Sequence, residues 1–189
     1  MESVAFLNQN ILNYQFPSLI EFKLALDSSD ALQAKTRYFN SFDGEFYASE
    51  NRFENATVSC TSVEYFFPEI KKFCNEMSRA FDMRVQCNAY ITPPKAQGLP
   101  LHYDLHDVFV VQIEGSKNWK TWDRIRSTVS VQTLISDQEH NLNVWTNFKK
   151  PKEFKLKPWE TLYLKLGVPH ECWSSEEESY HLTFGLYND

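Results

Sequence analysis

Four segments decide the fold of this chain: Val85-Gln86-Cys87-Asn88-Ala89-Tyr90-Ile91-Thr92, Leu101-His102-Tyr103-Asp104, Asp107-Val108-Phe109-Val110-Val111-Gln112-Ile113-Glu114, and the stretch 117–123 that begins Lys117-Asn118-Trp119. The first, third and fourth alternate with a period of two, which is typical of strands. The same alternation returns at 154–156, 161–166 and 180–186. Short strands with tight turns and no helices between them predict an antiparallel sandwich or barrel, so the expected fold class is mainly β.

Helical patterns are confined to the first part of the chain. Apolar residues recur at steps of three and four in 17–26, and Pro68 begins a second amphipathic stretch that carries Ile70, Phe73 and Met77 on one stripe. Residues 36–66 lack a clear period and are expected to form loops with one or two strands. The sequence predicts a single domain, with a helical and loop cap over 1–83, a core barrel over 84–189, and an insertion at its rim over 124–150.

Length and charge restrict the class of protein. A chain of 189 residues has room for one domain. The net charge of −6 argues against a nucleic-acid binder, and no apolar run reaches the about 18 residues that span a membrane. The first residues lack a basic segment, and the four cysteines form neither a zinc pattern nor a disulfide framework. We expect a cytoplasmic protein with reduced thiols.

His102 and Asp104 are the first candidates for chemistry. On a strand, residues two apart point to the same face, so the two side chains are expected to converge, and His170 can supply a third ligand from a later turn. Two histidines and one carboxylate on one side of a metal ion are typical of non-haem Fe(II) oxygenases. The plainer interpretation is a hydrogen-bonded strand histidine and a turn aspartate. His106 shares the expected face and stays open as a ligand.

The motifs surrounding these residues resemble a known family. Residues 88–94, 98–104 and 107–119, followed by 158–167, His170 and 179–183, resemble the barrel of JmjC-type oxygenases of the cupin superfamily, and most closely the ribosomal-oxygenase branch. The resemblance implies a double-stranded β-helix that binds Fe(II) through His102, Asp104 and His170 and uses 2-oxoglutarate and O2. It also implies that the distal carboxylate of 2-oxoglutarate pairs with Lys117.

Other pocket residues follow from the same resemblance. It places Asn88 and Tyr90 against 2-oxoglutarate, with the Tyr90 hydroxyl beside Lys117. The alternatives are a solvated hairpin lysine at Lys117 and a polar barrel layer at Asn88 and Tyr90. His181 falls where the family has a packing or hydrogen-bonding residue. Five aromatic residues are expected in the cleft wall or in the core: Phe109, Trp119, Trp122, Tyr163 and Trp173.

The substrate is less constrained than the chemistry. The resemblance implies hydroxylation of a side chain in a peptide or protein. The alternatives are hydroxylation of a free amino acid or other small metabolite, demethylation of a methylated lysine, and a non-catalytic cupin that binds a ligand. The basic stretch 149–157 either guides an acidic substrate or protects an edge strand. The sequence does not indicate an oligomeric state.

Overall fold

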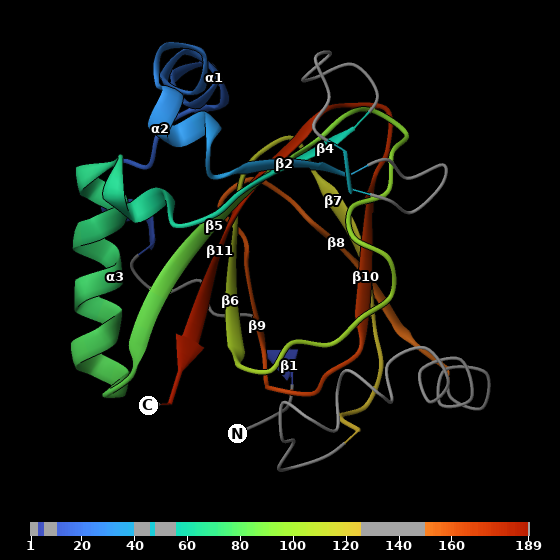
Figure 1. The fold of residues 1–189 in the computed structure, drawn as a ribbon. Helices are drawn as coiled ribbons and strands as arrows, with labels where there is room; N and C mark the ends of the chain where they lie inside the picture. The colour runs from blue at the N-terminus through green and yellow to red at the C-terminus, as the bar shows by residue number, and fades with distance from the viewer. Residues whose placement is uncertain (1–3, 6–10, 40–45, 48–55, 126–149, 189) are drawn as a thin grey trace.

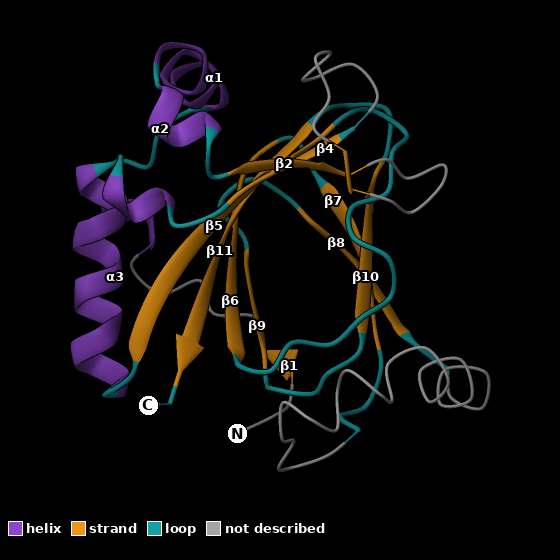
Figure 2. Ribbon diagram, viewed as in Figure 1, coloured by secondary structure: helices purple, strands orange, loops and turns teal. Residues whose placement is uncertain are grey.

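Two antiparallel sheets face each other, with helices packed against the outer face of the larger one (Figures 1 and 2). The computed structural model describes residues 4–5, 11–39, 46–47, 56–125 and 150–188. Most of the expected insertion at 124–150 therefore lies outside the described residues. The architecture is mainly β and has the form of a double-stranded β-helix, which confirms the predicted fold class.

The larger sheet has eight strands in the order β1-β9-β6-β11-β5-β4-β2-β3, and the smaller has three in the order β10-β7-β8. The strands of the larger sheet are β1 (Val4–Ala5), β2 (Thr36–Phe39), β3 (Phe46–Tyr47), β4 (Thr57–Cys60), β5 (Arg84–Thr92), β6 (Asp107–Glu114), β9 (Thr161–Leu164) and β11 (Ser179–Tyr187). Those of the smaller sheet are β7 (Lys117–Thr121), β8 (Lys152–Leu156) and β10 (His170–Ser174).

The first 83 residues contribute strands as well as helices. β1, β2, β3 and β4 all join the larger sheet, so its hydrogen bonding continues across the predicted boundary at 83/84. The division into a cap and a core barrel stays a prediction. Of the region 36–66, the described part contains three short strands and one 3-10 helix, η2 (Val63–Tyr65).

The helices begin where the sequence signals them. α1 (Leu19–Ser28) starts after Ser18, whose side chain accepts from the backbone N–H of Glu21, while the Glu21 carboxylate accepts from the backbone N–H of Ser18. α3 (Pro68–Phe81) starts with proline at its first turn and ends at Asp82 in a left-handed conformation. The short elements η1 (Ile11–Asn13) and α2 (Asp30–Gln33) complete the set. Both predicted helices are confirmed.

Strand β6 is buried on both faces, and this explains its nearly continuous apolar sequence. Val108 and Val110 face the smaller sheet, whereas Phe109 and Val111 face the helices. Phe109 lies close to Phe73 of α3, with ring centroids 6.1 Å apart. Alternate residues of one strand therefore support two cores, and only the inner one borders the space between the sheets.

The smaller sheet has lysines along one edge. β8 pairs only with β7 in the described part of the chain, and its Lys152 and Lys155 are exposed. This placement agrees with the edge-strand interpretation of the basic stretch 149–157. Within the described residues, no helix combines the length and apolar character needed to cross a membrane.

Candidate metal centre

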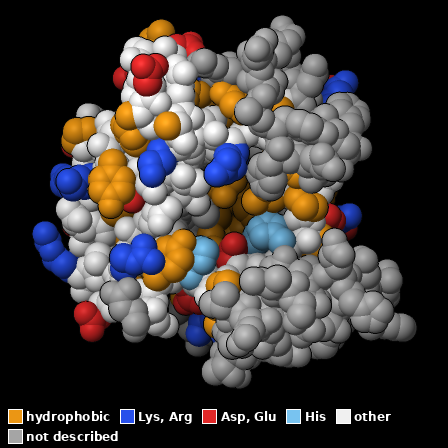
Figure 3. Space-filling model, in the orientation of Figure 1, with side chains coloured by type: hydrophobic (Ala, Val, Ile, Leu, Met, Phe, Trp, Pro, Cys, Tyr) orange, Lys and Arg blue, Asp and Glu red, His pale blue; other side chains and the backbone are white. Residues whose placement is uncertain are grey.

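A pocket opens between the two sheets, with a volume of about 560 Å³ including its mouth. Figure 3 shows the mouth as a hollow with an apolar floor and with histidine and acidic side chains at its rim. Of the five aromatic residues expected in a cleft wall or the core, Trp119 lines this pocket. Phe109 and Tyr163 belong to the core beneath the helices, Trp122 is also buried, and Trp173 is half-buried beneath Lys120.

His102 and Asp104 lie in the loop between β5 and β6, and the expectation that they occupy a strand was wrong. This loop runs beside β10. Backbone hydrogen bonds join Lys95 N to Ser175 O, Gly98 N to Cys172 O, and His102 to His170 in both directions, with N–O distances of 3.1 and 2.8 Å. The two histidines therefore come together through backbone pairing of distant segments, which alternation within one strand could not reveal.

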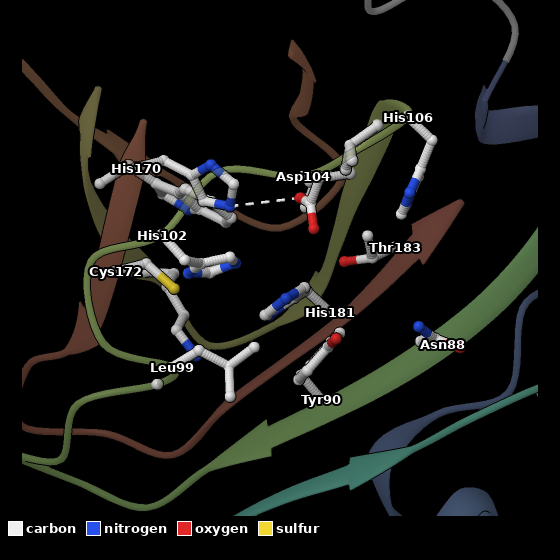
Figure 4. Close-up of a pocket in the computed structure, with 15 residues that line it drawn as sticks. Asn88, Tyr90, Leu99, His102, Asp104, His106, His170, Cys172, His181 and Thr183 are labelled. Atoms are coloured by element: carbon white, nitrogen blue, oxygen red, sulfur yellow. Dashed lines mark ion pairs between the residues drawn. The ribbon is translucent and has the colours of Figure 1, made fainter. Parts of the chain in front are cut away.

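The three predicted metal ligands converge at one end of the pocket. One ligand atom from each of His102, Asp104 and His170 lies within 4.8 Å of the others. Nε2 of His170 is 3.6 Å from Oδ2 of Asp104, and the two imidazole centroids are 4.3 Å apart (Figure 4). The backbone of Asp104 is fixed by a hydrogen bond, because its carbonyl oxygen accepts from the N–H of Gly167, a residue with φ of 79°.

Both imidazoles are oriented in the same way. Nδ1 of His102 lies 2.7 Å from the carbonyl oxygen of Pro100, and Nδ1 of His170 lies 3.0 Å from that of Val168. A carbonyl can only accept, so each Nδ1 donates a proton and each Nε2 is the ring nitrogen left to face a metal. Histidines that bind metals are commonly oriented by such a contact at the other ring nitrogen. The geometry leaves two imidazole nitrogens and one carboxylate available to a cation.

The protonation states also suit metal binding. Burial lowers the pKa of His170 to about 4, with positive charge on His102 acting in the same direction and Asp104 opposing both. Burial alone would raise the pKa of Asp104, but charge on His102, His170 and His106 outweighs it and lowers the pKa below its ordinary 3.8. Near neutral pH the site therefore offers a neutral imidazole at His170 and an ionised carboxylate at Asp104.

Acid should destabilise the metal-free protein. Between pH 6.5 and about 4, the unfolded chain protonates His170 while the folded chain does not, so the free energy of unfolding falls as pH falls. The loss from this residue is on the order of 3 kcal/mol and stops growing below its folded pKa. Burial shifts the pKa of His106 and His181 downward too, and this adds to the effect.

Urea unfolding of the chelator-treated protein at pH 7, 6, 5 and 4 measures this loss. His170→Gln should flatten the dependence without removing it, because His106 and His181 remain. A free energy of unfolding that stays constant over this range would contradict the prediction.

Lys117 lies at the other end of the same pocket and is 0% exposed. It follows a tight turn at Gly115, whose φ is 61°, and its ammonium donates to the hydroxyl of Thr92. No carboxylate within the described chain forms an ion pair with it. Burial lowers its pKa. This burial excludes a solvated hairpin lysine, and an ammonium with a single hydroxyl partner lacks the counter-charge that buried cations require.

Asn88 and Tyr90 both line the pocket, but the Tyr90 hydroxyl does not point as expected. It lies on the side of Asn88 (Figure 4), and the side chains of Asn88 and Ser59 hydrogen-bond with it. The hydroxyl that accepts from Lys117 belongs to Thr92. Burial raises the pKa of Tyr90 to about 12, with the Asp104 charge adding to it, so its hydroxyl stays protonated. Sequence reasoning missed Thr92, although it shares a face of β5 with Asn88 and Tyr90.

His106 is separate from the three converging side chains. Its ring stacks on Tyr187 at 4.2 Å and packs over Gly185, where a Cβ would come within 2.8 Å of the imidazole. It lines the mouth of the pocket, yet it is not in the group whose ligand atoms meet. Residues 105 and 106 form a bend, so the pleat argument that kept His106 open as a ligand does not apply.

Two facing antiparallel sheets that enclose a pocket with two histidines and a carboxylate define a metal-binding double-stranded β-helix. The chain belongs to the JmjC domain family, which it matches over residues 62–189. It is 31% identical over 137 residues to ribosomal oxygenase 2 of Bos taurus, a match that covers 71% of this chain and 28% of that protein.

A second relative and a solved structure are also similar to the chain. The chain is 27% identical over 135 residues to the bifunctional lysine-specific demethylase and histidyl-hydroxylase NO66 of Drosophila sechellia, with 71% of this chain and 20% of that protein covered. The structure of the Escherichia coli ribosomal oxygenase YcfD in complex with cobalt and 2-oxoglutarate has the same fold, with a TM-score of 0.70 and 18% identity, over 98% of this chain and 48% of that one. The matched region covers less than a third of the length of ribosomal oxygenase 2 and of NO66.

Proposed function

We propose that this protein is an Fe(II)- and 2-oxoglutarate-dependent oxygenase that hydroxylates a side chain of a peptide or protein. The observation that carries the proposal is the pairing of two incomplete sites in one pocket. At one end His102, Asp104 and His170 offer three ligands to a cation, and at the other the buried ammonium of Lys117 has no anionic partner among the described residues.

The residues fit the proposed groups chemically. Two imidazoles and one carboxylate on one side of a cation suit Fe(II) and leave coordination positions for other ligands. Lys117 would pair with one carboxylate of a dicarboxylate, and the three metal ligands would hold the cation to which its other end would bind. Gly98 supports this arrangement, because a Cβ there would lie 3.6 Å from the Lys117 ammonium and 3.1 Å from the Cys172 sulfur. A side chain at Gly98 would occupy the space beside the ammonium.

Each residue then has a definite task. When bound, Fe(II) and 2-oxoglutarate supply the activation of O2 that inserts oxygen into a C–H bond. His102, Asp104 and His170 would hold the metal, and Lys117 would fix the direction of the cosubstrate through a charge-assisted hydrogen bond. Val108, Val110 and Trp119 line the pocket and limit the access of water. The open mouth beside His106 is the side from which a substrate reaches the metal.

Hydroxylation is proposed over demethylation on the weight of the relatives. The names of these relatives include ribosomal oxygenases and a histidyl-hydroxylase. Demethylation occurs only in the name of NO66, which also names histidyl hydroxylation. Relatives named for ribosomal targets favour a protein substrate over a free amino acid.

Anaerobic titration tests the proposal. Fe(II) followed by 2-oxoglutarate should produce the weak visible charge-transfer band of a chelated keto acid, and O2 should then convert 2-oxoglutarate to succinate. Absence of the band with iron bound would exclude the function. Mass spectrometry of candidate ribosomal peptides decides the reaction, because hydroxylation adds one oxygen atom and demethylation releases formaldehyde.

A further inference from the structure

His181 is a buried imidazole that has no hydrogen-bond partner within the described chain. It is 3% exposed, lines the pocket, and has its Nδ1 closed off from solvent and unpaired. A buried polar atom without a partner costs about 1–3 kcal/mol, so a nitrogen of this kind is rare in folded proteins and calls for an explanation. Because Nδ1 is closed off from solvent, a molecule in the pocket would meet the ring at Nε2. None of the roles described above uses this residue.

The strand register places His181 one step from Lys117. On the inner face of the larger sheet, Thr92 of β5 pairs with Ser179 of β11, and Tyr90 pairs with His181. Lys117 donates to Thr92, so its ammonium lies at the Thr92–Ser179 pair, the first of these two cross-strand pairs. Successive steps on one strand face are about 7 Å apart. His181 therefore follows directly on the ammonium, along the pocket toward the metal ligands.

The smaller sheet gives the same order. Ser174 pairs with Lys117, Cys172 with Trp119, and His170 with Thr121. His181 faces the middle step, because its ring lies 5.9 Å from that of Trp119. A dicarboxylate that reached from the three metal ligands to Lys117 would therefore lie beside His181.

The imidazole is held rigidly and in its neutral form. It stacks on Tyr90 with ring centroids 5.0 Å apart and planes 14° apart (Figure 4). Trp119 meets it edge-on. Burial, and next the charge of Lys117, lower its pKa well below the ordinary 6.5. A neutral imidazole carries one N–H donor, and two rings fix the direction in which the donor can point.

We propose that His181 is a further binding residue for the cosubstrate, donating a hydrogen bond to the distal carboxylate that Lys117 also holds. The inference rests on the proposed function and adds a specificity element to it. Lys117 supplies charge, and His181 supplies a directional donor from the opposite sheet. Together they distinguish a keto acid with a second carboxylate from one without.

The test compares two keto acids on anaerobic Fe(II)-loaded protein by the charge-transfer band. His181→Phe keeps an aromatic ring between Tyr90 and Trp119 and removes both ring nitrogens. It should weaken 2-oxoglutarate binding by about tenfold or more, since a hydrogen bond to a charged group is lost. It should leave unchanged the affinity for 2-oxobutanoate, which lacks the distal carboxylate.

Tyr180→Phe is the matched control. Tyr180 is the neighbouring residue of β11, also carries a buried unpaired polar atom, and faces the core beneath the helices. Removing the Tyr180 hydroxyl should not change the affinity for either keto acid.

Two results for His181→Phe would overturn the proposal: unchanged affinity for 2-oxoglutarate, or an equal loss for both keto acids, which would indicate a merely structural role. If the wild-type protein itself gave no band with iron bound, the proposed function would fail first. Should His181→Phe not fold, NMR of ¹⁵N-histidine-labelled, Zn(II)-loaded wild-type protein provides the second measurement. The His181 nitrogen resonances should shift with 2-oxoglutarate and not with 2-oxobutanoate, and no shift with 2-oxoglutarate would overturn the proposal.

Discussion

Asp104→Ala is expected to abolish metal binding while the fold stays intact. The carboxylate is the only anionic ligand in the group of three, so its loss leaves two neutral imidazoles to hold a dication. Replacing mere outer partners of metal ligands lowers affinity by about 10–100-fold. Loss of the ligand itself should exceed that range.

Binding of Mn(II), followed by its electron paramagnetic resonance signal, measures this change without any turnover. The fold should survive because the hydrogen bond from Gly167 goes to the backbone oxygen of Asp104, which alanine keeps. Glu171→Ala is the matched control, since it removes a carboxylate next to His170 on the alternate face of β10. Metal affinity of Asp104→Ala equal to that of the wild type would contradict the assignment of Asp104 as a ligand.

Lys117→Met should weaken 2-oxoglutarate binding and stabilise the metal-free protein at the same time. Methionine fills a similar volume without charge. Binding should weaken by about 10–100-fold, because a hydrogen bond between charged groups is lost. The free energy of unfolding should rise, because the wild-type protein buries an ammonium whose partner in the described chain is a single hydroxyl, that of Thr92.

The two opposite changes separate binding from a structural role. Cosubstrate affinity comes from the charge-transfer titration, and stability comes from urea unfolding. Lys120→Met is the matched control, because Lys120 is on the same strand but points outward, toward Glu153 and over the ring of Trp173. If Lys117→Met bound 2-oxoglutarate normally, or lost affinity only in proportion to lost stability, the assigned role of Lys117 would be wrong.

Local sequence rules predicted most of the fold. Period-two alternation located β5, β6, β7, β8, β9 and β11, and Pro68 located α3. These elements carry their signal within a few residues. β10 was missed because its sequence, His170-Glu171-Cys172-Trp173-Ser174, has no clear alternation of apolar and polar residues. β2, β3 and β4 lie in 36–66, where loops with one or two strands were expected. Their bounds could not be predicted, because strands this short depend on neighbours distant in sequence.

The sequence proposed residues for the candidate site, but it could not predict their geometry. Motif order pointed to His102, Asp104, His170 and Lys117, and the structure brings the first three together at one end of a pocket and buries the fourth at the other. Local pattern could not show that a loop paired with β10 delivers His102. Nor could it show the missing partner of His181, because burial and register arise only from the assembled sheets.

The loop that carries His102 and Asp104 also determines how the small sheet meets solvent. By pairing with β10 at Gly98 and His102, it covers strand backbone that would otherwise be free to pair with another chain. One segment thus has two tasks: it carries two of the three converging side chains, and it shields the edge strand of the small sheet.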